Sequence, residues 1–137
     1  MILRQHKDSQ YLWKKLQKSR FVRYNARYGQ IHIGPALLDD FGIEYGQECY
    51  VLFANDEATG EWYITLTQDK EMGGFHLIQS RKSQTQRNAL MCQRRTFTRL
   101  LAQEFGTDAM KCPVSQKAIV QDEIKWYKLL TSINLIK

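Results

Sequence analysis

The stretch from Tyr28 to Phe53 constrains the fold most, because strand, turn and helix signals follow one another there at short intervals. Ile31 and Ile33 alternate with polar residues, which is typical of a half-buried strand. Gly34-Pro35 ends that strand, since proline cannot donate to a sheet but fits the first turn of a helix. We therefore predict a strand, a short helix over residues 36–41, a glycine-marked turn and a second strand.

The rest of the chain repeats these signals. Gly42 is placed to end the short helix in a left-handed conformation. Apolar, β-prone runs at 49–53 and 62–66 flank a turn-rich segment and predict a hairpin. Strands are also predicted at 21–25, 75–80 and 89–92. A helix is predicted over 96–105, with its inward face formed by Phe97, Leu100, Leu101 and Phe105.

An internal repeat relates the two halves of the chain. Phe41-Gly42 and Phe105-Gly106 are separated by the same number of residues as Trp62-Tyr63 and Trp126-Tyr127. Units this small do not bury a sufficient core alone, so we expect them to pack together. The sequence thus predicts one compact domain with a basic helix or arm at 1–20, a first repeat at 21–70 and a second at 71–137. Two generic sets of helix-end and strand signals would give the same coincidence.

Charge is distributed in three blocks. Residues 1–27 hold eight Lys and Arg against one acidic residue, 28–71 hold one against nine, and 72–137 hold eleven against four. Two basic blocks around an acidic one could form a surface that binds a polyanion, although a solvated basic face gives the same count.

The segment GQIHIGPALLDDFGIEYGQECYVLF resembles the AbrB-like swapped-hairpin family (SpoVT/AbrB and MazE type). The match is carried by a pattern of glycines and apolar residues and by a proline one position late, Pro35; the matching residues are Gly29, Ile31, Ile33, Leu37, Phe41, Gly42, Ile43 and Gly46. The resemblance implies a mainly β fold with short helices (α+β). In it, two β-β-α-β-β units would pack as an intramolecular pseudo-dimer barrel, because family members usually interleave two such units as homodimers.

The resemblance also implies a transcription regulator that binds double-stranded DNA through basic loops on one face of the barrel. Carried onto this chain, the implied contacts fall in three groups: Arg20, Arg23 and Arg27 around the first loop; Arg81, Lys82 and Arg87 in the corresponding loop of the second half; and Arg94 and Arg95 at the second helix start. Family members that bind DNA tend to carry arginines where this chain has Gln30, Asp39 and Asp40, so the binding face is expected to be asymmetric.

Two other functions remain open. The acidic block or the basic arm could grip a protein partner, as in an antitoxin or an inhibitor from a mobile element. Aromatic residues among the basic ones could stack on single-stranded nucleic acid; these are Tyr24, Tyr28, Tyr45, Tyr50, Trp62 and Trp126.

Other classes have no sequence support. The histidines and cysteines lack metal-ligand spacing, and no phosphate loop, nucleophile elbow or catalytic acid pair is present, so we expect no enzyme, no metal and no cofactor. No apolar run is long enough for a membrane span and no signal peptide precedes the fold, so we expect a cytoplasmic, nucleoid-associated protein, either a pseudo-dimeric monomer or a homodimer. The three cysteines are expected to be buried free thiols.

Overall fold

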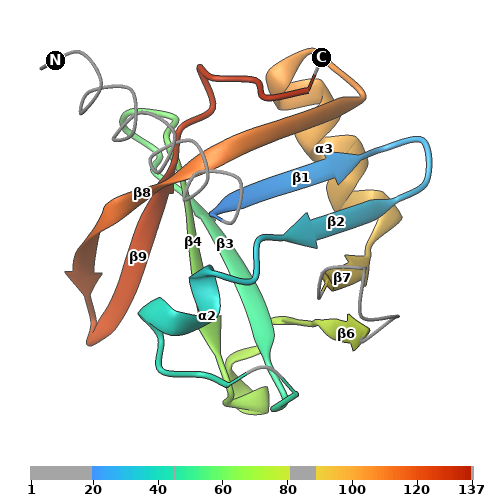
Figure 1. The fold of residues 1–137 in the computed structure, drawn as a ribbon. Helices are drawn as coiled ribbons and strands as arrows, with labels where there is room; N and C mark the ends of the chain where they lie inside the picture. The colour runs from blue at the N-terminus through green and yellow to red at the C-terminus, as the bar shows by residue number, and fades with distance from the viewer. Residues whose placement is uncertain (1–19, 45, 81–88, 137) are drawn as a thin grey trace, which may run out of the picture.

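The computed structural model describes residues 20–44, 46–80 and 89–136, which form a mainly β fold with short helices (Figure 1). The strands are β1 (Phe21–Asn25), β2 (Gln30–Ile33), β3 (Tyr50–Asn55), β4 (Trp62–Thr67), β5 (Phe75–His76), β6 (Ile78–Ser80), β7 (Ala89–Gln93), β8 (Ala109–Gln121) and β9 (Ile124–Leu129). The helical elements are α2 (Leu37–Asp40), α3 (Arg95–Phe105) and the 3-10 turn η1 (Lys70–Met72). Residues 1–19 of the basic helix or arm predicted at 1–20 lie outside the described residues.

The described strands form one antiparallel sheet in the order β5-β3-β4-β9-β8-β1-β2-β7-β6. Its two edge strands, β5 and β6, are consecutive in the chain and separated by Leu77 alone. The Leu77 N–H donates to the Cys49 carbonyl oxygen at 2.9 Å, which ties this segment to the start of β3. The sheet is therefore a nearly closed antiparallel β barrel, and the predicted strand at 75–80 is two short strands on either side of Leu77.

The predicted strands at 21–25, 62–66 and 89–92 are confirmed, as is the hairpin formed by β3 and β4. Alternation explains β1 and β2: Val22, Tyr24, Ile31 and Ile33 are buried, while the polar residues between them point to the outer side of the sheet. The turn from β1 to β2 ends at Gly29, whose positive φ of 67° suits glycine.

Helix α3 packs on the core through aromatic side chains. The centroid of the Phe97 ring lies 5.1 Å from that of the Phe53 ring and 6.1 Å from that of the Trp62 ring. Leu101, on the same helix, is buried in the core. Leu100, predicted to face inward, is instead 44% exposed. The buried position one turn before Leu101 is taken by Thr98, whose hydroxyl donates to the Arg95 carbonyl oxygen at 3.0 Å.

Helix α2 is shorter, spanning Leu37–Asp40 rather than the predicted 36–41. Leu37 and Leu38 are buried, and the Phe41 ring meets the Tyr127 ring edge-on at a centroid distance of 5.3 Å. Gly42 follows in the left-handed conformation, with φ of 66°, as predicted. The short helix thus covers the β9 side of the barrel, while α3 covers the β3 and β4 side.

The two Trp-Tyr pairs do not occupy equivalent positions. Ile64 on β4 is opposite Tyr127 on β9 and both side chains are buried, so Trp62, two residues before Ile64, faces the same interior. Trp126 precedes Tyr127 and therefore faces outward. A shift of one residue in strand register moves every side chain to the other face. The repeat aligns Trp62 with Trp126 in the sequence, but for that reason their side chains face opposite sides of the sheet.

The three cysteines are buried free thiols, as predicted. Burial raises the pKa of the Cys49 and Cys92 thiols to about 11 and that of Cys112 to about 12. They serve as small apolar side chains of the core.

Candidate nucleic-acid interface

The turn between β1 and β2 lies against the start of α3. The Arg94 N–H donates to the Gly29 carbonyl oxygen at 2.8 Å, and the Gln93 side-chain amide donates to the Tyr28 carbonyl oxygen at 3.2 Å. The Arg95 side chain packs directly over Gly29, where an added Cβ would lie only 2.5 Å from the Arg95 Cγ. These contacts bring Arg27, from the first half of the chain, to the same end of the barrel as Arg94 and Arg95, from the second.

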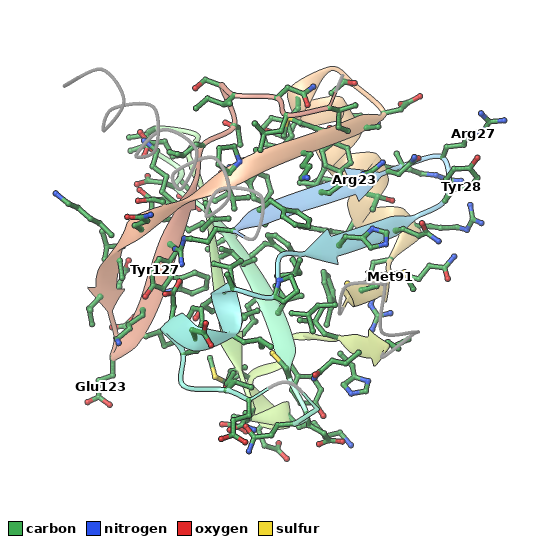
Figure 2. The ribbon with its side chains drawn as sticks, viewed as in Figure 1. Arg23, Arg27, Tyr28, Met91, Glu123 and Tyr127 are labelled. Atoms are coloured by element: carbon green, nitrogen blue, oxygen red, sulfur yellow. The ribbon has the colours of Figure 1, made fainter. Side chains whose placement is uncertain are left out.

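A row of outward side chains crosses the strands next to this turn. Arg23 on β1 is opposite His32 on β2 and Lys111 on β8, and His32 is in turn opposite Met91 on β7. Residues opposite one another in register share one side of a sheet. Figure 2 shows Arg23 and Met91 on these strands, with Arg27 and Tyr28 projecting from the turn beyond them.

We call this surface the basic face and define it by Arg23, Arg27, His32, Arg94, Arg95 and Lys111. Its four arginines are exposed. Among the residues that the structure describes, no carboxylate forms an ion pair with any of these four arginines. Their charge is therefore available to an anionic ligand.

Aromatic rings and backbone groups orient several of these cations. The Arg27 guanidinium lies 5.7 Å from the Tyr28 ring centroid, the Arg94 guanidinium 5.2 Å from that of Phe75, and the Lys111 ammonium 4.4 Å from that of Phe21. A guanidinium has five N–H donors in a planar fork, so one ring contact leaves donors for a ligand.

His32 contributes a neutral side chain to the basic face. Burial and the nearby Arg23 charge lower the pKa of its imidazole from the ordinary value of 6.5. At pH 7 the ring is therefore uncharged, with one donor and one acceptor nitrogen.

Asp108 is an acidic neighbour of this surface. Its carbonyl oxygen accepts a 2.7 Å hydrogen bond from the Ala26 N–H, which joins it to the β1–β2 turn, and its side chain is exposed. Together with burial and Cys112, its carboxylate raises the pKa of Tyr24, to about 12. A carboxylate at this place opposes the binding of phosphate.

Arg20, predicted to contact DNA, is buried. Its guanidinium forms an ion pair with Asp40, donates to the Ser115 carbonyl oxygen at 2.6 Å and lies 5.6 Å from the Tyr127 ring centroid. These contacts join α2, β8 and β9, so we do not include Arg20 in the basic face.

Three other predicted contact residues, Arg81, Lys82 and Arg87, lie outside the described residues. They belong to the connection between β6 and β7, whose flanking residues Ser80 and Ala89 are opposite one another. Ala89 is at the start of β7, whereas Gln93, at its end, lies beside the β1–β2 turn. Ser80 and Ala89 are therefore at the end of β7 away from that turn.

Three residues at this surface, His32, Lys111 and Asp108, were not among the predicted site residues. Lys111 meets the first half of the chain through the β1–β8 pairing, and Asp108 through its hydrogen bond with Ala26; both contacts join residues far apart in the sequence. Alternation places Lys111 on the outer side of β8, between buried Met110 and Cys112, but no local signal identifies Arg23 as its neighbour.

The aromatic residues considered as stacking platforms divide into two groups. Tyr24, Tyr50 and Trp62 are buried, whereas Tyr28 is 52% exposed and Trp126 is half-buried on the outer side of β9. Tyr45 lies outside the described residues. Tyr28, which lies beside Arg27 of the basic face, is therefore exposed enough to stack on a base.

Comparison of the chain with protein-family models, curated proteins and solved structures gives no match. In the part of the chain that the structure describes, no helix has the length and apolar character needed to cross a membrane. The same residues contain no group of three or more His, Cys, Asp or Glu side chains arranged to hold a metal ion.

Proposed function

We propose that the protein is a regulator that binds double-stranded DNA with its basic face and is built as a single-chain AbrB-like pseudo-dimer. The observation that carries the proposal is the joining of Arg27 to Arg94 and Arg95 by the contacts at Gly29, beside the outward Arg23. Four exposed arginines from both halves of the chain, without ion-paired carboxylates among the described residues, form a surface suited to phosphates.

The strand order supports the pseudo-dimer. If the two-residue strand β5 is left out, exchanging β1, β2, β3 and β4 for β6, β7, β8 and β9 reproduces the same circular order of strands. Under this exchange Ile64 corresponds to Tyr127, its own partner in the sheet, so this pair maps onto itself. The paired Val51 and Leu66 correspond to the paired Val114 and Leu129. Residues that correspond in the sheet are one residue closer together in the sequence than the two tryptophans are. This difference of one residue agrees with the opposite orientations of the two tryptophans.

The expected contact geometry follows from the β1–β2 hairpin. A two-stranded ribbon fits the major groove of B-DNA, which is about 12 Å wide. Arg23 and the neutral His32 would face base edges from the centre of the ribbon, and Arg27 would enter from its turn. Arg94 and Arg95, beside the turn, would hold phosphates and set the orientation.

The experiment is a fluorescence-anisotropy titration of a duplex between about 50 and about 200 mM salt, where the two phosphate contacts of Arg94 and Arg95 give a log–log slope of roughly −2. The variant Arg94→Ala/Arg95→Ala should reduce the magnitude of this slope by about 2. The matched control, Lys117→Ala/Lys125→Ala, removes the same charge from the exposed β8–β9 hairpin and should keep the parent slope. The proposal is wrong if the parent does not bind at low salt, or if the control loses as much affinity as the test variant.

The exposed Tyr28 favours a second candidate, the binding of single-stranded nucleic acid. In that case a single-stranded oligonucleotide would compete more strongly than the duplex, and Tyr28→Leu would remove about 1 to 3 kcal/mol of binding free energy. Duplex preference with an unchanged affinity of Tyr28→Leu would exclude this candidate.

A further inference from the structure

A second surface lies on the outer side of β3, β4, β9 and β8. Tyr63 faces outward because the next residue, Ile64, is buried, and Trp126 faces outward because Tyr127 is buried. Ile119 is opposite Trp126 in register and is 49% exposed. These side chains and Ile124 line a groove of about 420 Å³, which we call the outer groove.

The charged side chains that line the outer groove are acidic. Asp56, Glu57 and Asp122 belong to its lining, and none of the described residues that line it is basic. Asp56 accepts hydrogen bonds from the Ala58 and Thr59 N–H groups and so shapes the β3–β4 turn. Glu57 and Asp122 form no ion pair with any described cation. Nucleic acid is therefore repelled here, and a positively charged ligand is attracted.

The aromatic lining is held in place by neighbouring contacts. The Tyr63 hydroxyl donates to a Glu61 carboxylate oxygen at 3.1 Å, and the same oxygen pairs with the Lys128 ammonium at 3.2 Å. The β8–β9 hairpin turns through Asp122 and Glu123, which have positive φ values of 55° and 67°, and this tight turn keeps Ile119 beside Trp126. Figure 2 shows Glu123 at the tip of this hairpin, far from Arg27.

We propose that the outer groove docks an extended segment of a partner protein, in which an apolar side chain is flanked by lysines or arginines. The apolar side chain would pack between Tyr63, Trp126 and Ile119, and its basic neighbours would meet Glu57 and Asp122. Tyrosine and tryptophan supply much of the binding energy at protein interfaces, and charge complementarity selects the partner. The chain would thus hold nucleic acid and a protein on separate surfaces.

The test uses the full chain and a synthetic peptide that alternates leucine and lysine, with an otherwise identical leucine–glutamate peptide as the control ligand. With the lysine peptide, amide shifts in a ¹⁵N–¹H NMR titration should occur at residues 54–57, 63 and 119–126. The glutamate peptide should bind at least about tenfold more weakly than the lysine peptide. Ile119→Lys should weaken the binding of the lysine peptide by about tenfold, because it puts a cation into the groove. Val120→Lys is the matched control: its side chain, 69% exposed, faces the other side of the same strand, so this variant should bind like the parent.

Several results would overturn the proposal. Shifts outside the groove, equal binding of both peptides, or equal losses in the two lysine variants would show that the groove does not select a basic apolar segment. Binding that requires Leu12→Asp/Leu16→Asp in the full chain would assign the groove to the chain's own N-terminal segment. Concentration-dependent dimerisation that Ile119→Lys abolishes would assign it to a second copy. Failure of the duplex titration leaves this proposal unaffected, because the two surfaces share no residue.

Discussion

Replacing Arg20 separates a structural role from a DNA-binding role. The Arg20 side chain is 10% exposed and that of its partner Asp40 is 24% exposed. Arg20→Met keeps most of the aliphatic stem and removes the guanidinium, so it breaks the ion pair, the hydrogen bond to the Ser115 carbonyl oxygen and the contact with the Tyr127 ring. The Asp40 carboxylate is left without its cation.

The expected loss of unfolding free energy follows from these exposures. Breaking a buried ion pair by removing one partner costs about 3 to 5 kcal/mol, because the remaining charge is left uncompensated. Asp40 retains some contact with water, which places the expected loss near the lower end, at about 3 kcal/mol. In a chain of this size that loss lowers the unfolding midpoint by roughly 10 °C.

The assay is thermal and urea unfolding followed by circular dichroism, for Arg20→Met, Asp40→Asn and the double variant. The single variants should each lose unfolding free energy. The double variant should lose less than the sum of the two single losses, by about 1 kcal/mol or more, because neither residue then leaves a charge behind. Lys128→Met is the control: it breaks the exposed pair with Glu61 and should cost about 1 kcal/mol or less. If Arg20→Met unfolds like the parent but loses DNA affinity, Arg20 belongs to the binding surface and our account of it is wrong.

Three further substitutions test other parts of the structure. Glu123→Gly should raise the unfolding free energy by about 1 kcal/mol in urea titrations, since the left-handed conformation is unfavourable for other residues; an unchanged or lower value would contradict the positive φ. Gly29→Ala should lower it by about 2 kcal/mol or more, because strain at positive φ adds to the contact of its Cβ with the Arg95 side chain; unchanged unfolding would contradict that packing. Asp108→Asn removes a carboxylate beside the basic face and should tighten duplex binding about threefold at low salt, an effect that should shrink as salt is added; unchanged affinity at low salt would contradict its place there.

Local signals in the sequence were sufficient for most elements of the fold. The alternation at 21–25 and 30–33, the helix-ending Gly42 and Gly106 and the turn-rich segment before Trp62 each depend on residues next to one another in the chain. The strand at 75–80 was predicted as continuous because nothing in its apolar pattern indicates the change of partner at Leu77, from β3 to β7.

Long-range features could not be predicted in the same way. The sequence repeat aligns the two Trp-Tyr pairs, but the barrel pairs β4 with β9 in a register that puts Trp62 inside and Trp126 outside. Arg20 was assigned to DNA because it stands just before the first loop, where the family resemblance implies contacts, whereas its burial depends on Asp40 and Ser115, which only the folded chain brings to it. The outer groove likewise depends on neighbours contributed by four separate strands.

The most direct test of the central claim, that the basic face binds duplex DNA, is a ¹⁵N–¹H NMR titration of the full chain with a short duplex at low salt. The account predicts amide shifts at residues 23–32, 93–95 and 111, with residues 54–57, 63 and 119–126 unchanged. Shifts confined to the second set, or no shifts at saturating duplex, would contradict it.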